Sequence, residues 1–405
     1  MTIGVGTFTV TDRMRALVNE VLDTGRISYG PMSREFERRF ALIHESPFAV
    51  LSNSGTSSLH VALQALKELH DWQDGDEVIV PAVTFVATVN VVLHNRLTPV
   101  LIDVDPLYYE IDPYLIEQAI TPRTRAILPV HLFGQPANMT AIMAIAERRR
   151  LKVVEDSCEC MFVRHAGRMV GSFGDVGCFS TYVAHLLTTG VGGLGLTANP
   201  DLAACMRSLV NHGRDGIYLS IDDDDEAGGE HLKEIILRRF NFERVGHSFR
   251  ITELEAALGL AQLETWQAMI VQRQRNAARL SVLLAGLYPY IQLPRTRPNT
   301  EHSWMMYPIV MIHEDKHSLT EHLEAHGIET RDMLPITNQP AYRGLFRESD
   351  YPIAEWINRS GFYVGCHQDL TDADLVSISD TIHSYFGIDR PTEVELESWP
   401  TLLTT

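Results

Sequence analysis

Short apolar runs alternate with amphipathic segments between about residues 48 and 200. The apolar runs predict buried strands, and the segments between them, with apolar residues three and four positions apart, predict helices. The predicted strands are residues 48–51, 77–80, 100–102, 126–130 and 152–155. This alternation is typical of an α/β fold with a mostly parallel sheet covered on both faces. Ligands of such sheets bind at the carboxyl ends of the strands, so we expect the functional residues there.

A second, smaller unit is predicted for the C-terminal third. Thr252 and Glu255 have the spacing of a capping box, which predicts the start of a helix that leads away from the first unit. The segment from about residue 265 has the pattern of a smaller α/β domain. We therefore expect a large domain over residues 1–264 and a small domain over residues 265–405. Residues 221–230, which are acidic and contain glycine, predict a solvated loop.

The net charge of the chain narrows the classes of macromolecule that the protein could bind. The 405 residues include 52 acidic and 34 basic side chains, a net charge of -18, which argues against nucleic acid and anionic membranes as partners. No uncharged stretch reaches the ~20 apolar residues of a membrane-spanning helix, and the first residues lack the pattern of a signal peptide. Five cysteines, with Cys158 and Cys160 as the only close pair, suit a reducing cytoplasm and predict no metal site.

Three segments carry residues with candidate chemistry. Residues 54–57 lie between a strand and a helix, where a glycine and free N–H groups suit a phosphate, although a plain turn has the same composition. Asp156 ends a predicted strand and could hold a protonated ring nitrogen or cap a helix. His185 lies in a hydroxyl-rich segment flanked by glycine turns, where a structural role is equally open.

Taken in order, these segments resemble the DegT/DnrJ/EryC1/StrS family of sugar aminotransferases, which have the aspartate aminotransferase fold and bind pyridoxal phosphate (PLP). The resemblance spans nearly the whole chain. It rests on Gly30-Pro31, Asn53-Ser54-Gly55-Thr56, residues 75–81, 84–88 and 129–135, Glu155-Asp156, Thr188-Thr189-Gly190, residues 253–259 and Gln262-Leu263.

The resemblance implies a set of cofactor-binding residues in the large domain. Asp156 would pair with the pyridine nitrogen, Phe85 would stack on the ring, and the backbone after residue 54 would hold the phosphate with the Ser180 hydroxyl. The implied cofactor residues are Ser54, Gly55, Thr56, Phe85, Asp156, Glu159, Ser180 and Ser248. Family members bind the cofactor at a dimer interface, so a homodimer with a shared active site is implied.

His185 stands where aminotransferases of this family have the lysine that bonds covalently to PLP. Imidazole has no primary amine and cannot form that bond, but it can act as a base near neutral pH. The chain has only four lysines, and none has the sequence context to replace the missing one. These are Lys67, Lys152, Lys233 and Lys316.

The same replacement is found in one subgroup of the superfamily, the nucleotide-sugar 4-keto-6-deoxyhexose 3-dehydratases. Glu159, where aminotransferases usually have glutamine, and the Gly213-Arg214-Asp215 motif also resemble this subgroup. The cysteines do not match the pattern of its branch with a [2Fe–2S] cluster. The resemblance therefore points to the cluster-free branch, which includes GDP-4-keto-6-deoxymannose 3-dehydratase, and we expect no iron–sulfur cluster.

Two positions depart from the family pattern. Ser248 replaces an asparagine that the partner subunit usually provides, and Val191 replaces an acid. Both suggest an unusual substrate or a weakened cofactor site. The residues expected to contact substrate lie elsewhere, on variable loops and in the small domain. They are Tyr29, His212, Arg214, Tyr307 and Arg331.

The resemblance implies dehydration of a nucleotide-linked keto-sugar. Pyridoxamine phosphate (PMP), formed from PLP with L-glutamate as amino donor, would condense with the C4 ketone. His185 would remove a proton and then protonate the departing C3 hydroxyl, serving as base and as acid. Two alternatives remain open. One is an aminotransferase-like enzyme acting on another keto substrate, and the other is a non-catalytic protein that binds a nucleotide sugar.

Overall fold

The large domain is built on a seven-stranded sheet. A computed structural model describes residues 2–216, 227–334 and 336–392. The strand order is β1-β9-β8-β5-β4-β2-β3, and β9 runs antiparallel to both of its neighbours while the remaining pairs are parallel. The strands are β1 (Phe48–Ser52), β2 (Glu77–Pro81), β3 (Thr98–Ile102), β4 (Thr124–Ile127), β5 (Lys152–Asp156), β8 (Val176–Ser180) and β9 (Gly193–Thr197). The predicted α/β fold with a mostly parallel sheet is confirmed.

One predicted strand ends earlier than expected. The apolar run over residues 126–130 predicts a strand through Val130, but β4 ends at Ile127. Pro129 has no N–H group to donate to a neighbouring strand, so the regular ladder stops before it. Val130 and Asp156 still form an isolated parallel bridge, which keeps the chain beside the end of β5.

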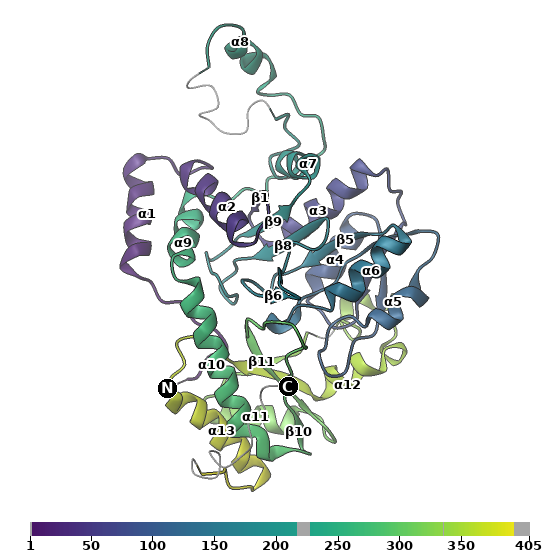
Figure 1. Ribbon diagram of the computed structural model, residues 1–405, viewed down its shortest axis with the longest axis vertical. Helices are drawn as coiled ribbons and strands as arrows, with labels where there is room; N and C mark the ends of the chain where they lie inside the picture. The colour runs from purple at the N-terminus through teal and green to yellow at the C-terminus, as the bar shows by residue number, and fades with distance from the viewer. Residues whose placement is uncertain (1, 217–226, 335, 393–405) are drawn as a thin grey trace.

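Helices cover this sheet and join it to the rest of the chain. Figure 1 shows α1, α2 and α9 on one flank of the sheet and α5 and α6 toward the other. The large-domain helices are α1 (Asp12–Thr24), α2 (Pro31–Ile43), α3 (Gly55–Leu69), α4 (Val86–His94), α5 (Pro113–Ala119), η1 (Leu132–Gly134), α6 (Met139–Arg149), α7 (Pro200–Val210), α8 (Gly229–Arg238) and α9 (Glu253–Leu263). A short hairpin, β6 (Arg164–His165) with β7 (Arg168–Met169), lies outside the main sheet.

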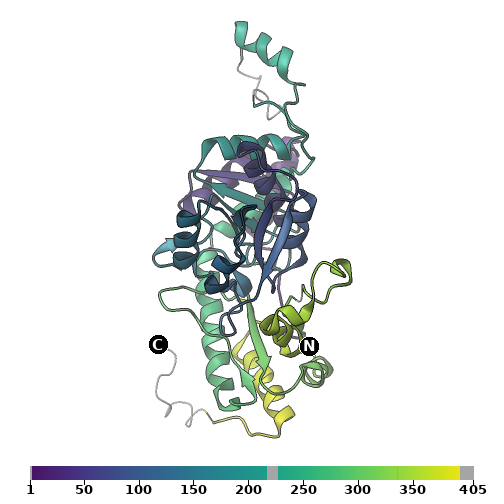
Figure 2. The ribbon, with the colours of Figure 1, turned by 90° about the vertical axis from the view of Figure 1, so that its right-hand side faces the viewer.

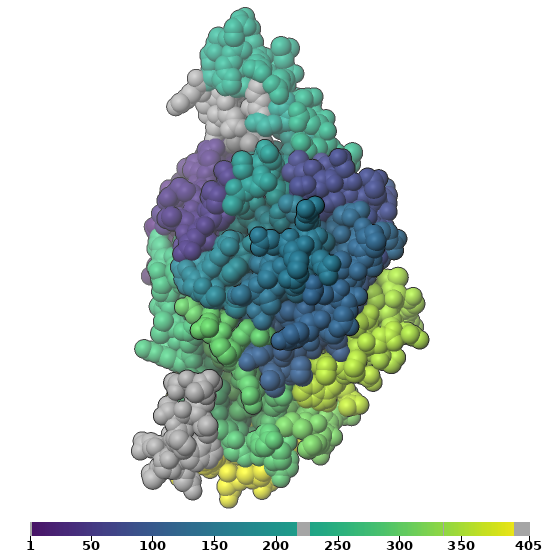
Figure 3. All heavy atoms as spheres, turned by 45° about the vertical axis from the view of Figure 1, so that its right-hand side comes forward, coloured from purple at the N-terminus to yellow at the C-terminus, as the bar shows by residue number. Residues whose placement is uncertain are grey.

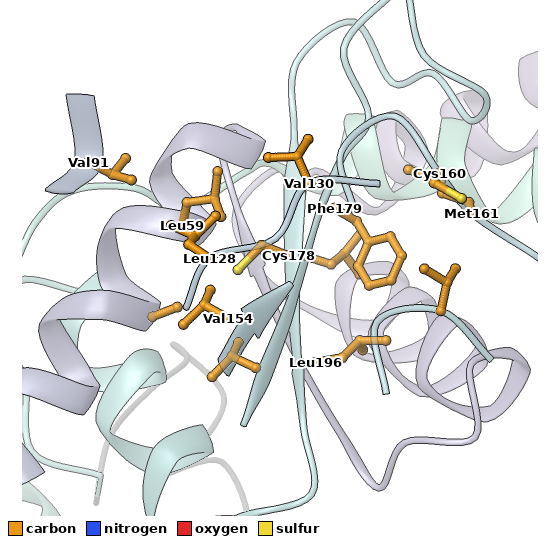
Figure 4. Packing of buried hydrophobic residues seen from close by; sticks show 14 of the residues in the cluster. Leu59, Val91, Leu128, Val130, Val154, Cys160, Met161, Cys178, Phe179 and Leu196 are labelled. Carbon is orange, nitrogen blue, oxygen red and sulfur yellow. The ribbon is translucent and has the colours of Figure 1, made fainter. Parts of the chain in front are cut away.

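Apolar packing against both faces of the sheet forms the core. Leu59 of α3, Val154 of β5 and Phe179 of β8 are fully buried and meet in one cluster, as Figure 4 shows. The predicted apolar face of α3 lies within this cluster, which fixes the N-terminus of that helix beside the strand ends. The site residues at the strand ends are therefore held against a close-packed core.

The predicted helix after Thr252 is confirmed, but it does not lead away from the large domain, because it packs against α1 and α2 there. Thr252 and Glu255 form the capping box of α9. The buried carboxylate of Glu253 accepts hydrogen bonds from the N–H groups of Gly30, Met32 and Ser33 at the start of α2. An acid at a helix N-terminus satisfies N–H groups that have no partner within the helix, so one side chain joins α9 to α2.

The long helix α10 leads to a second sheet of four antiparallel strands in the order β10-β11-β13-β12. Figures 1 and 2 show this part of the chain at the opposite end from α8. Its elements are α10 (Trp266–Leu284), η2 (Ala285–Leu287), β10 (Ile291–Gln292), β11 (Met306–Met311), α11 (His317–Ala325), β12 (Arg331–Asp332), η3 (Pro340–Tyr342), η4 (Glu348–Asp350), α12 (Pro352–Ser360), β13 (Gly361–Gly365) and α13 (Asp372–Phe386). The domain boundary at 264/265 stays a prediction.

The segment that contains α8, described over residues 227–246 and called the arm below, projects away from the rest of the large domain (Figure 1). Figures 2 and 3 show it projecting beyond α7 at one end of the molecule. Of the predicted acidic loop, residues 221–226 lie outside the described residues, and the described part leads into α8. No helix within the described ranges is long and apolar enough to cross a membrane.

Candidate active site

A cavity of about 370 Å³ opens at the carboxyl ends of β5 and β8, with residues of the second sheet on its far side. Its walls come from the large sheet, from the segments that follow its strands, and from the small domain. The lining residues include Ser54, Gly55, Thr56, Thr84, Phe85, Asp156, Cys158, Glu159, Ser180, Tyr182, His185, Met305, Met306, Leu334 and Tyr363. The position agrees with the rule that open α/β sheets bind ligands beyond the carboxyl ends of their strands.

The N-terminus of α3 forms one wall of this cavity. Ser54 caps the helix, and its side-chain oxygen accepts a hydrogen bond from the Ser57 N–H group at 3.0 Å. Gly55 and Thr56 begin the helix, with Ser180 at the end of β8 facing them. Free N–H groups and the positive end of the helix dipole favour an anion here.

Gly55 is required by close packing. A Cβ atom at this position would lie 2.6 Å from Cys158 Sγ and 2.7 Å from Ser180 Cβ. No larger residue fits without moving β8 or the segment after β5, so the glycine brings the helix N-terminus against the strand ends. This observation favours a phosphate site over a plain strand-to-helix turn.

We expect Gly55→Ala to weaken the site. The added methyl group overpacks the wall, which costs about 1–3 kcal/mol of stability, and it displaces Ser180 from the helix N-terminus. Thermal unfolding and titration with inorganic phosphate or PLP measure the two effects. Gly228→Ala is the matched control, because a Cβ atom there meets nothing within 4 Å. Equal phosphate and PLP affinities for Gly55→Ala and Gly228→Ala would contradict a phosphate role.

Asp156 places a buried carboxylate in the cavity. Its Oδ2 accepts a hydrogen bond from Thr88 Oγ1 at 2.8 Å, and its Oδ1 accepts one from the Cys158 N–H group at 3.2 Å. Burial raises the pKa of Asp156, and the hydrogen bonds from Cys158 and Thr88 oppose this effect. A cation brought into the site would relieve the cost of burying the charge, so the carboxylate suits a protonated ring nitrogen.

Two further predicted residues face the same space. Phe85 precedes α4 and leaves 56% of its surface exposed, although it lies beside a packed core. Such a ring provides a flat apolar surface for a planar ligand. Glu159 is buried and accepts a hydrogen bond from the Phe133 N–H group at 2.9 Å. Burial is the main cause that raises the pKa of Glu159 to about 7, and the nearby Asp156 adds to it.

His185 lies in the loop between β8 and β9 and lines the cavity. Its ring keeps an open edge, but the Nδ1 atom is buried without a hydrogen-bond partner. Burial lowers the pKa of His185 to about 4, and the Cys158 backbone opposes this effect by hydrogen bonding. With this lowered pKa the ring is neutral at physiological pH and can accept a proton.

Comparison with known proteins agrees with this geometry. The model of the DegT/DnrJ/EryC1/StrS aminotransferase family matches residues 9–383. The chain belongs to this family. It is 36% identical over 366 residues to the GDP-perosamine synthase of Caulobacter vibrioides, an alignment that covers 89% of this chain and 92% of that protein. The predicted family resemblance is therefore confirmed.

Solved structures of the family have the same fold. Streptomyces venezuelae DesV, in complex with a ketimine intermediate, is 34% identical, with a TM-score of 0.82 and coverage of 92% of this chain and 94% of that chain. An Escherichia coli GDP-4-keto-6-deoxy-D-mannose 3-dehydratase with bound hydrated PLP has a TM-score of 0.86 and covers 94% of this chain and 100% of its own. At 24% identity, the second comparison establishes the fold only.

None of the four lysines lines the cavity. Lys67 donates to Asp74, Lys152 to Asp175 and Lys233 to Glu230. Lys316 is buried and donates to the carbonyl oxygens of residues 358 and 361 in the small domain. Each ammonium group already has partners away from the site, so His185 is not replaced by a lysine of the same chain.

Four of the predicted site residues gather instead near the base of the arm. His212 Nε2 lies 3.1 Å from an Arg250 guanidinium nitrogen, which also donates to Ser248 Oγ at 3.4 Å. Arg214 stacks on two phenylalanines of the arm, and Tyr29 hydrogen-bonds to Glu37. None of them lines the cavity in the same chain, so their predicted roles as binding residues remain predictions.

Tyr307 and Arg331 of the small domain also lie outside the cavity lining. Tyr307 is fully buried, and its hydroxyl group lies 2.8 Å from Ser281 Oγ, because alternate residues of β11 point to opposite faces of the sheet. Arg331 is exposed and pairs with Glu329. Its register partner in β13 is Tyr363, which does line the cavity.

The sequence prediction missed the small-domain wall of the site. Met305, Met306, Leu334 and Tyr363 are distant along the chain from the family motifs, and ordinary core residues have the same composition. The sequence suggests only a metal-ligand role to weigh for Cys158, whereas its Sγ atom packs against Gly55 in the fold. No three His, Cys, Asp or Glu side chains in the described part of the chain are arranged to hold a metal ion.

Proposed function

We propose that the protein is a PLP/PMP-dependent 3-dehydratase that acts on a nucleotide-linked 4-keto-6-deoxy sugar. The observation that carries the proposal is His185, a neutral imidazole in the wall of the cavity whose Nδ1 atom has no hydrogen-bond partner. Such a ring can remove a proton but cannot bind a carbonyl carbon as an amine does. The missing lysine closes the usual route of amino transfer and favours elimination.

The residues present fit a phosphorylated pyridine cofactor. The close approach at Gly55 supports a phosphate at the α3 N-terminus with Ser180, and the buried Asp156 supports a cationic ring nitrogen. Phe85 supports a flat ring. When bound, PMP supplies an amine that condenses with a ketone and a ring that accepts electrons.

The protein's own groups would orient the substrate and move protons. His185 would remove a proton through its neutral nitrogen, Asp156 would hold the ring nitrogen of a bound cofactor in its protonated form, and Met305 and Leu334 would exclude water from the far wall. The C3 hydroxyl leaves, and hydrolysis gives a 3-deoxy-4-keto sugar and ammonia. L-glutamate is the amino donor that restores PMP.

A second candidate is amino transfer to a nucleotide-linked keto sugar without a covalent lysine bond. The 36% identity to a GDP-perosamine synthase and the aminotransferase description of the family favour it. The two reactions differ in product. Elimination removes an oxygen from the sugar and releases ammonia, whereas amino transfer leaves nitrogen on the sugar.

Product analysis separates these candidates. We expect the protein loaded with PMP to convert GDP-4-keto-6-deoxymannose, or its dTDP-linked glucose counterpart, to a 3-deoxy sugar with release of ammonia, measured by mass spectrometry and an ammonia assay. An amino sugar in place of the deoxy sugar would support the second candidate. Binding of the nucleotide sugar without turnover of either compound would indicate a binding protein.

Borohydride reduction tests the role of position 185 independently of turnover. We expect reduction of the PLP-loaded protein to leave the cofactor removable, because no amine of the chain reaches it. In His185→Lys the same treatment should fix the cofactor to the protein, and the product should shift toward amino transfer. Covalent labelling of the unaltered protein would contradict the proposal.

We also propose a homodimer in which the arm of one subunit completes the site of the other. The arm exposes Ile236, Leu237, Phe240, Phe242 and Val245, and a monomer would leave these apolar side chains in water. His212, Arg214 and Ser248 at its base would then reach a neighbouring cavity.

A further inference from the structure

The ionisable groups of the cavity divide into two sets with opposite tendencies. Burial lowers the pKa of His185. Burial raises the pKa of Glu159, which lines the same cavity, to about 7. Groups whose surroundings push their pKa values apart are the usual acid and base of an active site. The cavity thus contains a base and a second group with the opposite tendency.

Tyr363 brings a hydroxyl group to this cavity from the small domain. It lies in the middle of β13, opposite Pro308 of β11 and Arg331 of β12, and only 7% of its surface is exposed. Its ring centroid lies 5.8 Å from that of Phe133. The hydroxyl group has no hydrogen-bond partner among the residues that the structure describes, and the side chain lines the cavity. A hydroxyl group that lines a cavity without a protein partner can form its hydrogen bond with a ligand there.

Glu159 lines the same cavity as this hydroxyl group, and both side chains meet Phe133. One oxygen of Glu159 accepts a hydrogen bond from the Phe133 N–H group, and the Phe133 ring packs against the Tyr363 ring. Burial is the main cause that raises the pKa of Tyr363, and Glu159 adds to it. A carboxyl group in the same wall can return a proton to the hydroxyl group, directly or through water.

We propose that Tyr363 is the acid of the reaction, donating its hydroxyl proton to the sugar C3 oxygen as that oxygen leaves, with Glu159 restoring the proton. The inference rests on the proposed dehydration and deepens it, because it assigns to two residues the work that the sequence analysis gave to His185 alone.

The proposed step balances in atoms and charge. The C3–O bond breaks, and its electron pair stays with the oxygen, which takes the Tyr363 proton and leaves as water. The electrons that replace the broken bond at C3 come from the carbon–hydrogen bond whose proton His185 accepts. Glu159 returns a proton to Tyr363 and regains one from solvent, while His185 releases its proton to solvent.

A change of leaving group tests the assignment. With the natural 3-hydroxy substrate, we expect Tyr363→Phe to lower kcat by about 100-fold, the loss typical of a general acid. With a 3-deoxy-3-fluoro analogue, fluoride needs no proton to leave, so the variant should release fluoride within about threefold of the unaltered protein. An equal loss on both substrates would overturn the acid role in favour of a structural one.

Ligand binding provides a second readout that needs no turnover. We expect Tyr363→Phe to weaken binding of GDP-mannose to the cofactor-free protein by roughly threefold to tenfold, the range for one lost hydrogen bond. Binding of GDP-3-deoxymannose should not change. Equal effects on the two ligands would overturn the proposed contact. Tyr290→Phe, an exposed tyrosine of the same domain, is the control and should change neither affinity.

The two proposals can fail separately. If the unaltered protein removes neither hydroxide nor fluoride, the proposed dehydration is wrong. If it removes both and Tyr363→Phe is as active as the unaltered protein on the hydroxy substrate, only the assignment of Tyr363 is wrong.

Discussion

His185→Asn should lose elimination activity by about 10²–10⁴-fold, the usual contribution of a positioned general base. Asparagine has a similar size and remains polar, but it cannot accept a proton near neutral pH. In the unaltered protein the lowered pKa of His185, about 4, means that the base form is present above that pH and is lost as the pH falls through it. Rates between pH 4 and 8, with cofactor affinity measured in parallel, check this prediction.

An exposed histidine outside the cavity supplies the matched control for this variant. His212 lies outside the cavity in the same chain and is proposed to serve a second subunit, so it is unsuitable. His326 is exposed at the end of α11, and His326→Asn should leave the rate unchanged. A His185→Asn variant that retains full activity would remove the main support for the proposed mechanism.

Asp156→Asn should lower activity by about 10²–10³-fold, as removal of one fixed electrostatic partner does. Both carboxylate oxygens already accept hydrogen bonds, from Thr88 and Cys158, so the group is oriented before any ligand binds. The neutral amide removes the charge that keeps a ring nitrogen protonated. Absorbance titration with PLP, together with single-turnover rates, separates loss of affinity from loss of reactivity.

Asp175 provides a control for charge loss in the same sheet. It accepts hydrogen bonds from Lys152 Nζ and the Val153 N–H group at 2.9 Å each, at the opposite end of β5. We expect Asp175→Asn to lower stability while cofactor binding stays intact. If Asp156→Asn retained the single-turnover rate of the unaltered protein, the proposed contact with the ring nitrogen would be wrong.

The residues next to the large-domain strands could be predicted because they are local in sequence. Ser54 to Thr56 follow β1, Asp156 ends β5, and Ser180 ends β8. Apolar runs identify β1 and β5, and the geometry of parallel sheets brings the carboxyl ends of such strands to one edge. The sequence pattern predicts neither β8 nor β9. The prediction that Ser180, Phe85, Glu159 and His185 belong to the same site came from the family resemblance.

The small-domain contribution could not be predicted in the same way. Tyr307 and Tyr363 lie on adjacent antiparallel strands, yet one is buried in the domain core and the other lines the cavity. In a strand a shift of one residue reverses the face to which a side chain points. The sequence does not state which face of the second sheet meets the large domain.

The sequence by itself determined the α/β fold, the family and the replacement of a lysine by His185, because each follows from patterns within short segments. Only the tertiary structure decided the surroundings of His185 and the placement of Glu159 and Tyr363 in one cavity. Burial sets which protons are held or released, and it depends here on segments more than 200 positions apart in the sequence, which fold around the same cavity.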